Sequence, residues 1–195
     1  VSKAQNLLIS EDVVAALGVI NKLGIKYKLN KTSCKIYGRG LDGYKYKKNL
    51  IIDAKNSGTL GRLILGLLIN ATNPIKLVGD KSLSKRDFNR IAKPLSKFGS
   101  SFKLRNQISL PLTINGSANL KPIKYFEKRG SAQCKSAVIL AALRTKGTTI
   151  IKAKKSRNHT ELLCKYLNLP ITVNKKKSYD IIKIRNARKI KGLNY

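Results

Sequence analysis

The 195-residue sequence contains no methionine, no tryptophan and a single histidine, His159. Its three cysteines, Cys34, Cys134 and Cys164, are widely spaced and include no CxxC pair. An odd number of separated cysteines argues against a disulfide framework, and one histidine leaves too few ligands for a zinc site. We therefore expect three buried thiols and no metal ion.

Long apolar runs are also missing. No uninterrupted run reaches the roughly 18 to 20 residues that a membrane-spanning helix needs. The opening segment VSKAQNLLISED lacks the basic head and apolar centre of a signal peptide. Hydrophobic residues still make up 42% of the chain, which is enough for a core. The composition therefore predicts a soluble, cytoplasmic protein without a membrane partner.

Acidic residues are scarce: nine Asp and Glu stand against 41 Lys and Arg, a net charge of +32. Such a charge favours nucleic acid as a partner. However, lysine far outnumbers arginine, the residue that reads bases, and the lysines are dispersed apart from Lys175 to Lys177. A basic RNA-binding or ribosome-associated protein stays an alternative, but 6% aromatic residues and no RNP-like motif give it little support. We expect nucleic acid to bind only nonspecifically, through charge.

Three similar segments recur roughly every 70 residues, which indicates repeated folding units. Each reads as the end of an amphipathic helix, a Gly or Asn stop, and a short strand. Before the first of them, Ser10 is placed to cap a helix whose apolar stripe includes Val13 and Leu17. The segments are INKLGIKYKL (20–29), PLSKFGSSFKL (94–104) and LCKYLNLPITV (163–173).

The predicted fold class is α/β, with units of the order β-α-β-α-β-β. In the middle unit the second helix is expected over 85–98, and in the first unit QNLLI (5–9) is expected to be the opening strand. That strand matches the third element of the later units, so the first unit lacks one strand and one helix. We expect one domain over 1–195, divided into 1–46 (partial unit), 47–117 (second unit), 118–187 (third unit) and 188–195 (start of a crossover to a second domain).

Two predicted helix starts carry small and polar residues: NSGT (56–59) and GSAQ (130–133). Free backbone N–H groups and the positive end of a helix dipole form an anion site there. Gly58 lets a ligand approach the backbone closely, and Arg62 lies one turn later. The competing interpretation is ordinary N-capping by Ser57 and Ser131.

Two arginines, Arg86 and Arg157, are expected at the starts of the second helices, where a guanidinium suits a carboxylate or phosphate. Any one such arginine is more often a solvated surface charge. No general-base pair stands out, and a lone histidine such as His159 is more often structural. We therefore identify no catalytic residue in this chain.

Five ordered motifs resemble those of the 5-enolpyruvylshikimate-3-phosphate synthase (3-phosphoshikimate 1-carboxyvinyltransferase) family. The resemblance covers nearly the whole chain and is strongest to the bacterial subgroup with SAQ-K-SA and SR-HTE. The motifs are NSGTLGRL, GDKSLSKRDFNRIAKPL, LPLTING, GSAQCKSAVILAAL and SRNHTELL.

This resemblance implies one of two domains of an inside-out barrel, each built from three β-α-β-α-β-β units. The family joins phosphoenolpyruvate to the 5-hydroxyl of shikimate 3-phosphate, in aromatic amino acid biosynthesis, without a cofactor. By resemblance, the shikimate 3-phosphate ligands are Ser131, Ala132, Gln133, Arg157 and, less directly, Ser156. The implied phosphoenolpyruvate ligands are Gly58, Arg86 and Gln133.

The family also has a catalytic Gly-Asp-Lys-Ser motif, but it lies nearer the N-terminus than NSGT. In this chain GDKSLSKR (79–86) follows NSGT, so Lys81 is not expected to be the catalytic lysine. The resemblance places that lysine before Val1 and the proton-transferring carboxylates in a second domain, so this chain alone is expected to be inactive. The complete enzyme is expected to be a monomer, and Gly58 is typical of glyphosate-sensitive members.

The nearest rival is the related enolpyruvyl transferase that acts on UDP-N-acetylglucosamine. It shares the architecture but uses a reactive-cysteine loop. No such loop is recognisable here, because Cys34, Cys134 and Cys164 fall on a predicted strand and in predicted helices.

Overall fold

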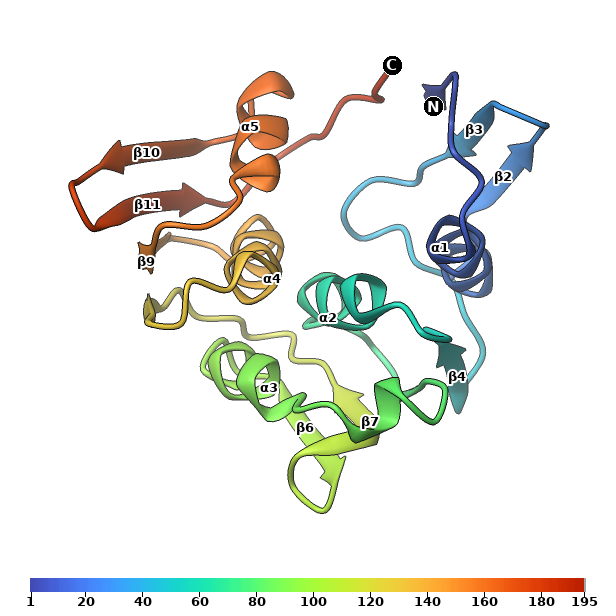
Figure 1. Cartoon of the computed structure of the whole chain (residues 1–195), viewed down its shortest axis with the longest axis horizontal. Coiled ribbons are helices and arrows are strands. Elements are labelled where there is room, and N and C mark those ends of the chain that lie inside the picture. The colour runs from blue at the N-terminus through green and yellow to red at the C-terminus, as the bar shows by residue number, and fades with distance from the viewer. Residues whose placement is uncertain (195) are drawn as a thin grey trace.

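Three small β-sheets lie around the outside of the molecule, and two helices lie side by side between them (Figure 1). The arrangement is that of a computed structural model, which describes residues 1–194. The two central helices are α2 (Gly58–Leu67) and α4 (Ala132–Ala142). Because α4 has buried residues on every side, it forms the middle of the core.

The second and third sheets share one topology. In each, the first two strands are parallel and the other neighbours are antiparallel. The second sheet has the order β4 (Leu50–Asp53), β5 (Ile75–Val78), β7 (Ser109–Asn115) and β6 (Ser101–Arg105). The third has the order β8 (Lys124–Glu127), β9 (Thr148–Lys154), β11 (Tyr179–Arg185) and β10 (Ile171–Lys175).

The first sheet has three antiparallel strands, in an order that matches the last three strands of the other sheets. They are β1 (Ser2–Ala4), β3 (Cys34–Tyr37) and β2 (Lys26–Leu29). Beside β1, the backbone N–H of Lys3 donates to the carbonyl of Leu193 at 2.7 Å. The predicted α/β fold class is confirmed. The last residue of the predicted crossover segment, Tyr195, lies outside the described residues.

The repeat seen in the sequence marks the ends of three helices: α1 (Glu11–Lys22), α3 (Asn89–Ser96) and α5 (His159–Tyr166). Each is followed by a residue with a left-handed backbone: Gly24 (φ 84°), Gly99 (φ 117°) and Asn168 (φ 53°). Glycine and asparagine tolerate this conformation best, so they stop the helix and turn the chain into the next strand. The predicted Gly or Asn stop is confirmed in all three.

Two sequence predictions were wrong. QNLLI does not form a strand, because the chain turns at Asn6 (φ 51°) and β1 ends before it. The expected helix over 85–98 is shorter, since a 3-10 turn, η1 (Leu83–Lys85), comes first and α3 begins only at Asn89. Asp80 accepts the backbone N–H of Leu83 at 2.6 Å and fixes this turn. Arg86 therefore lies in an extended connection before α3, not at its first residue.

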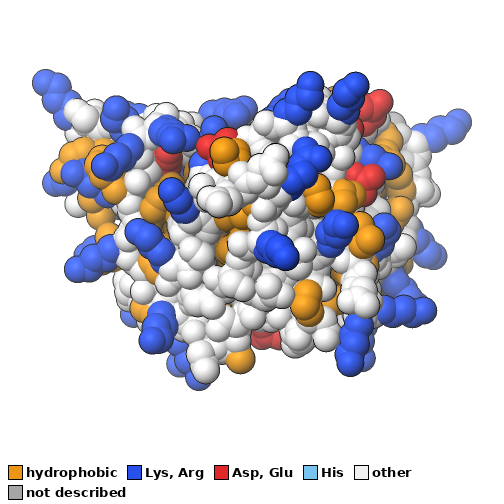
Figure 2. Space-filling view, turned by 90° about the horizontal axis from the view of Figure 1, so that it is seen from below, with side chains coloured by type: hydrophobic (Ala, Val, Ile, Leu, Met, Phe, Trp, Pro, Cys, Tyr) orange, Lys and Arg blue, Asp and Glu red, His pale blue; other side chains and the backbone are white. Residues whose placement is uncertain are grey.

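Basic side chains are scattered over the face that is seen from below Figure 1, with few acidic ones among them (Figure 2). The dispersed lysines of the sequence therefore remain dispersed on this surface. Within residues 1–194, none of the helices has both the length and the apolar character needed to cross a membrane.

The closest approach between α2 and α4 supplies a stability test. A Cβ added at Gly66 would overlap the backbone carbonyl of Ala137, and backbone cannot move aside as a side chain can. We expect Gly66→Ala to lower the free energy of unfolding by about 1 to 3 kcal/mol. Gly18→Ala in α1 is the matched control, since nothing lies within 4 Å of its added Cβ. It should raise stability by up to about 1 kcal/mol. Urea unfolding measures both, and equal effects would contradict the close packing.

Candidate functional site

The starts of α2 and α4 are built alike. Ser57 caps α2, and its Oγ accepts the backbone N–H of Leu60 at 3.2 Å. Ser131 caps α4, and its Oγ accepts the backbone N–H of Cys134 at 3.3 Å. Both serines therefore cap their helices, as the competing interpretation of the sequence held. Capping engages only part of the free N–H groups of a first turn, so each start keeps its positive dipole end.

Gln133 joins these two helix starts. Its Oε1 accepts from Arg62 Nη1 at 2.5 Å, and its Nε2 donates to Thr59 Oγ1 at 2.9 Å. A glutamine amide has two N–H groups and two acceptor lone pairs, so one of each remains free. Gln133 can therefore hold the helices together and still donate to, and accept from, a ligand.

Guanidinium groups converge beside Gly58. A Cβ added at this glycine would lie 3.0 Å from Arg86 Nη1 and 3.2 Å from Arg62 Nη1, so the missing side chain leaves the room that these groups use. Burial, and then the nearby charges of Arg90 and Arg86, lower the pKa of the Arg62 guanidinium. A bound anion would offset this repulsion, so the arrangement favours an anionic ligand.

A second group of residues lines a cavity of about 520 Å³ next to the start of α4. All five residues predicted to bind shikimate 3-phosphate lie on its wall. Ser131 Oγ accepts from Arg90 Nη2 at 2.9 Å as well as from the backbone, so its single hydroxyl proton remains for a ligand oxygen. The lining residues are Arg90, Arg129, Gly130, Ser131, Ala132, Gln133, Ser156 and Arg157.

Sequence reasoning missed two arginines of this cavity, Arg90 and Arg129. Arg90 follows Arg86 by four residues, a helical spacing that could have indicated a shared face. Arg129 precedes GSAQ directly, and its position depends on two carboxylates. Its backbone N–H donates to Glu127 Oε1 at 3.0 Å, and its Nη1 lies 3.8 Å from Asp87 Oδ2.

A smaller hollow of about 200 Å³ adjoins the same helix start, and Gln133, Arg157 and His159 contribute to its wall. Beneath it lies a buried ion pair that sequence reasoning also missed, between Lys135 of α4 and Glu161 of α5. In the described part of the chain, no three His, Cys, Asp or Glu side chains gather as metal ligands would.

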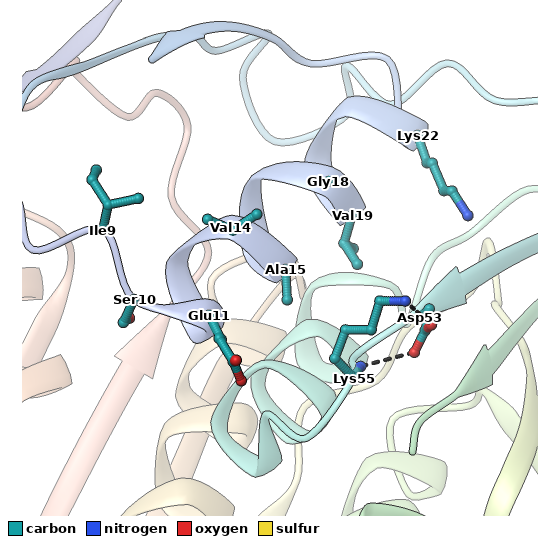
Figure 3. A pocket seen from close by; sticks show the side chains of 10 residues that line it. All are labelled: Ile9, Ser10, Glu11, Val14, Ala15, Gly18, Val19, Lys22, Asp53 and Lys55. Carbon is teal, nitrogen blue, oxygen red and sulfur yellow. Dashed lines mark hydrogen bonds and ion pairs between the residues drawn. The ribbon is translucent and has the colours of Figure 1, made fainter. Parts of the chain in front are cut away.

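A larger hollow, about 740 Å³, lies elsewhere, along the face of α1 that carries Val14 and Gly18 (Figure 3). None of the predicted ligand-binding residues lines it. Its two charged neighbours on the β4 side, Lys55 and Asp53, already pair at 2.9 Å. A third charged neighbour, Lys22, donates to the backbone carbonyl of Ile51 at 3.0 Å. The hollow also has the Glu11 and Asp53 carboxylates on its wall, so it suits an anion less well than the start of α4 does.

The fold and the site together define an α/β repeat protein whose paired central helices begin beside a group of arginine side chains. The profile of the EPSP synthase (3-phosphoshikimate 1-carboxyvinyltransferase) family matches residues 1–195. The chain belongs to this family.

Curated relatives agree with this assignment. The 3-phosphoshikimate 1-carboxyvinyltransferase of Streptococcus suis is 42% identical over 163 residues, which are 83% of this chain and 38% of the relative. That of Leuconostoc mesenteroides is 36% identical over 188 residues, 96% of this chain and 42% of the relative. The chain thus spans about two-fifths of the length of these relatives.

Solved structures agree as well. EPSP synthase from Acinetobacter baumannii superimposes with a TM-score of 0.89 at 31% identity, over 99% of this chain and 43% of that protein.

The cysteines bear on the rival that uses a reactive thiol. Cys34, Cys134 and Cys164 are all buried and free, as the sequence predicted. Burial, with a smaller contribution from Glu161, raises the pKa of Cys164 to about 11. Burial also raises the pKa of Cys34. A reactive thiol needs a lowered pKa and access to solvent, so neither of these two has that character.

We expect iodoacetamide at pH 8 to modify the folded chain at least about tenfold more slowly than the urea-unfolded chain, because all three thiols are buried. Intact mass followed over time measures the rate. Modification of one cysteine as fast in the folded as in the unfolded chain would contradict this and would revive the reactive-cysteine alternative.

Proposed function

We propose that this chain supplies the shikimate 3-phosphate half-site of a 3-phosphoshikimate 1-carboxyvinyltransferase. The complete enzyme transfers the enolpyruvyl group of phosphoenolpyruvate to the 5-hydroxyl of shikimate 3-phosphate, in aromatic amino acid biosynthesis. The observation that carries the proposal is the convergence of Ser131, Ala132, Gln133, Ser156 and Arg157 on one cavity that Arg90 and Arg129 also line.

The phosphate of shikimate 3-phosphate binds at the start of α4. The free Ser131 hydroxyl proton and the Arg157 guanidinium serve as donors, and the dipole of α4 adds to their effect. Arg90, which already orients Ser131, brings further positive charge to the same wall. The unused amide groups of Gln133 contact the sugar-like ring, whose hydroxyls both donate and accept.

Phosphoenolpyruvate binds at the neighbouring start of α2. The open space at Gly58 admits the ligand to the backbone, while Arg86 and Arg62 bind its anionic groups. Gln133 lies between the two ligands, because it contacts both Arg62 and Thr59. The two anions are thereby held side by side, and proximity supplies a large part of the rate of such a transfer.

Two glutamates near the site are already engaged in other contacts. Glu161 is paired with Lys135, and Glu127 accepts the backbone N–H of Arg129. The proposal assigns the catalytic lysine and the proton-transferring carboxylates to parts of the enzyme outside these residues, as the family resemblance implies. We include in this proposal the division into units at 46, 117 and 187, a second domain as partner of this one, and a monomeric cytoplasmic enzyme.

The binding test is an isotope-edited NMR titration of this chain with shikimate 3-phosphate at low and high salt. We expect saturable shifts near Ser131, Gln133 and Arg157 that persist at high salt, because Ser131 and Gln133 are half-buried, uncharged donors whose hydrogen bonds salt screens less than it screens surface charges. Arg157→Ala should weaken binding at least about tenfold, the loss expected for a charge-assisted hydrogen bond. Arg105→Ala, on exposed β6, should leave it unchanged.

A short RNA serves as the control ligand in the same titration. Its shifts should be spread over lysine-rich surfaces and should disappear as salt rises. Shifts with RNA alone, and none with shikimate 3-phosphate at either salt concentration, would overturn the proposed half-site.

The chain by itself should not turn over its substrates, because half a site cannot stabilise the transition state or move the proton. The assay is phosphate release from a mixture of phosphoenolpyruvate and shikimate 3-phosphate, compared with a buffer blank. Release that rises in proportion to the concentration of purified chain would contradict this expectation.

A further inference from the structure

A buried ion pair lies directly behind the Arg157 loop. The side chains of Lys135 and Glu161 are only 1% and 4% exposed, and Lys135 Nζ lies 2.6 Å from Glu161 Oε1. The free energy needed to take two charges out of water equals or exceeds the free energy gained from their attraction. An apolar pair of the same size would therefore pack equally well. Packing alone therefore does not account for this pair.

Lys135 makes one further contact, and this contact reaches the site. Its Nζ donates to the backbone carbonyl of Arg157 at 3.0 Å. Lys135 also lies one helical turn after Ser131, since its backbone N–H donates to the Ser131 carbonyl at 3.1 Å. One ammonium group thus connects the capped start of α4 with the loop that carries Arg157.

A second polar contact runs parallel to the first. Ser136 Oγ and Thr160 Oγ1, on the residues that follow Lys135 and precede Glu161, lie 2.7 Å apart. Within the described residues, Glu161 Oε2 is buried without a hydrogen-bond partner. The free energy needed to remove this oxygen from water is therefore not fully compensated. Such a cost is consistent with a role in placing the loop.

We propose that Lys135 and Glu161 are positioning residues for Arg157. The Lys135 ammonium, whose charge Glu161 balances, holds the Arg157 carbonyl and thereby fixes the guanidinium above the start of α4. Neither residue touches the ligand. This inference rests on the proposed function, because the fixed arginine matters for the phosphate of shikimate 3-phosphate.

The decisive variant is the double substitution Lys135→Met and Glu161→Leu. It leaves the net charge unchanged and leaves no buried charge unpaired, so the chain should unfold at the same or higher urea concentration. Affinity for shikimate 3-phosphate should nevertheless fall about tenfold, because Arg157 is no longer fixed in place. If the double variant keeps both stability and affinity, the pair only packs and the proposal fails.

The matched control removes a different ion pair without changing the net charge. Arg144 Nη2 and Asp42 Oδ1 lie 3.0 Å apart beyond the other end of α4, so Arg144→Met with Asp42→Asn should leave the affinity unchanged.

The effect must also act through Arg157. In an Arg157→Ala background, removing the Lys135–Glu161 pair should change the affinity less than about twofold. A full additional tenfold loss there would overturn the proposal.

A measurement without ligand separates this inference from the proposed function. In the free wild-type chain, the backbone ¹⁵N order parameter of Arg157 should be near about 0.85, and in the double variant it should fall below about 0.6. An unchanged order parameter overturns the positioning role, whether or not ligand binds. If the wild-type chain binds no shikimate 3-phosphate but the order parameter falls in the double variant as expected, the proposed function fails. The inference that Lys135 and Glu161 position Arg157 then still holds.

Discussion

The close contact of α2 with α4 is the constraint on which both the fold and the site depend. Gly66 allows the α2 backbone to approach the carbonyl of Ala137, and at the other end Gln133 links α4 to Thr59 and Arg62. Two helix starts are thereby placed next to each other with their dipoles facing one region. Arg86 lies beside Gly58 at the start of α2, and Arg157 lines the cavity at the start of α4.

Several arginine side chains lie close together in this region. Their mutual repulsion lowers the stability of the folded chain, and contacts with neighbouring side chains offset part of this loss. Burial, and then the charges of neighbouring arginines, lower the pKa of Arg62. Arg62 nevertheless donates to Gln133, and its guanidinium lies 5.6 Å from the centre of the Phe88 ring. Arg90 is held in turn by Ser131. The folded chain thus keeps cations together that an anion would stabilise further. Residues at such a site are placed for binding at some cost to the unligated protein.

Local signals made much of the fold predictable. Helix ends at Gly24, Gly99 and Asn168 follow from backbone preferences that act within a few residues, and the repeat made them visible. The strand predicted for QNLLI was wrong because the left-handed backbone conformation of Asn6, and not the apolar pattern, determines the course of the chain there. In the site, helix starts could be located from NSGT and GSAQ. The pairing of Lys135 with Glu161 could not be predicted from the sequence, because it depends on the packing of α4 against α5.

Net charge was a poor guide to function, and the structure gives the reason. Many lysines are exposed to water and salt, and one example is Lys76, which lies between buried Ile75 and Leu77 on β5. Basic side chains are scattered over the face drawn in Figure 2. Lys135 is a single charge in the interior, yet it contacts both Glu161 and the Arg157 carbonyl. A charge is specific in its contacts when its position is fixed and water is excluded, so the buried and hydrogen-bonded Lys135 differs from the many exposed cations that make up the count of +32.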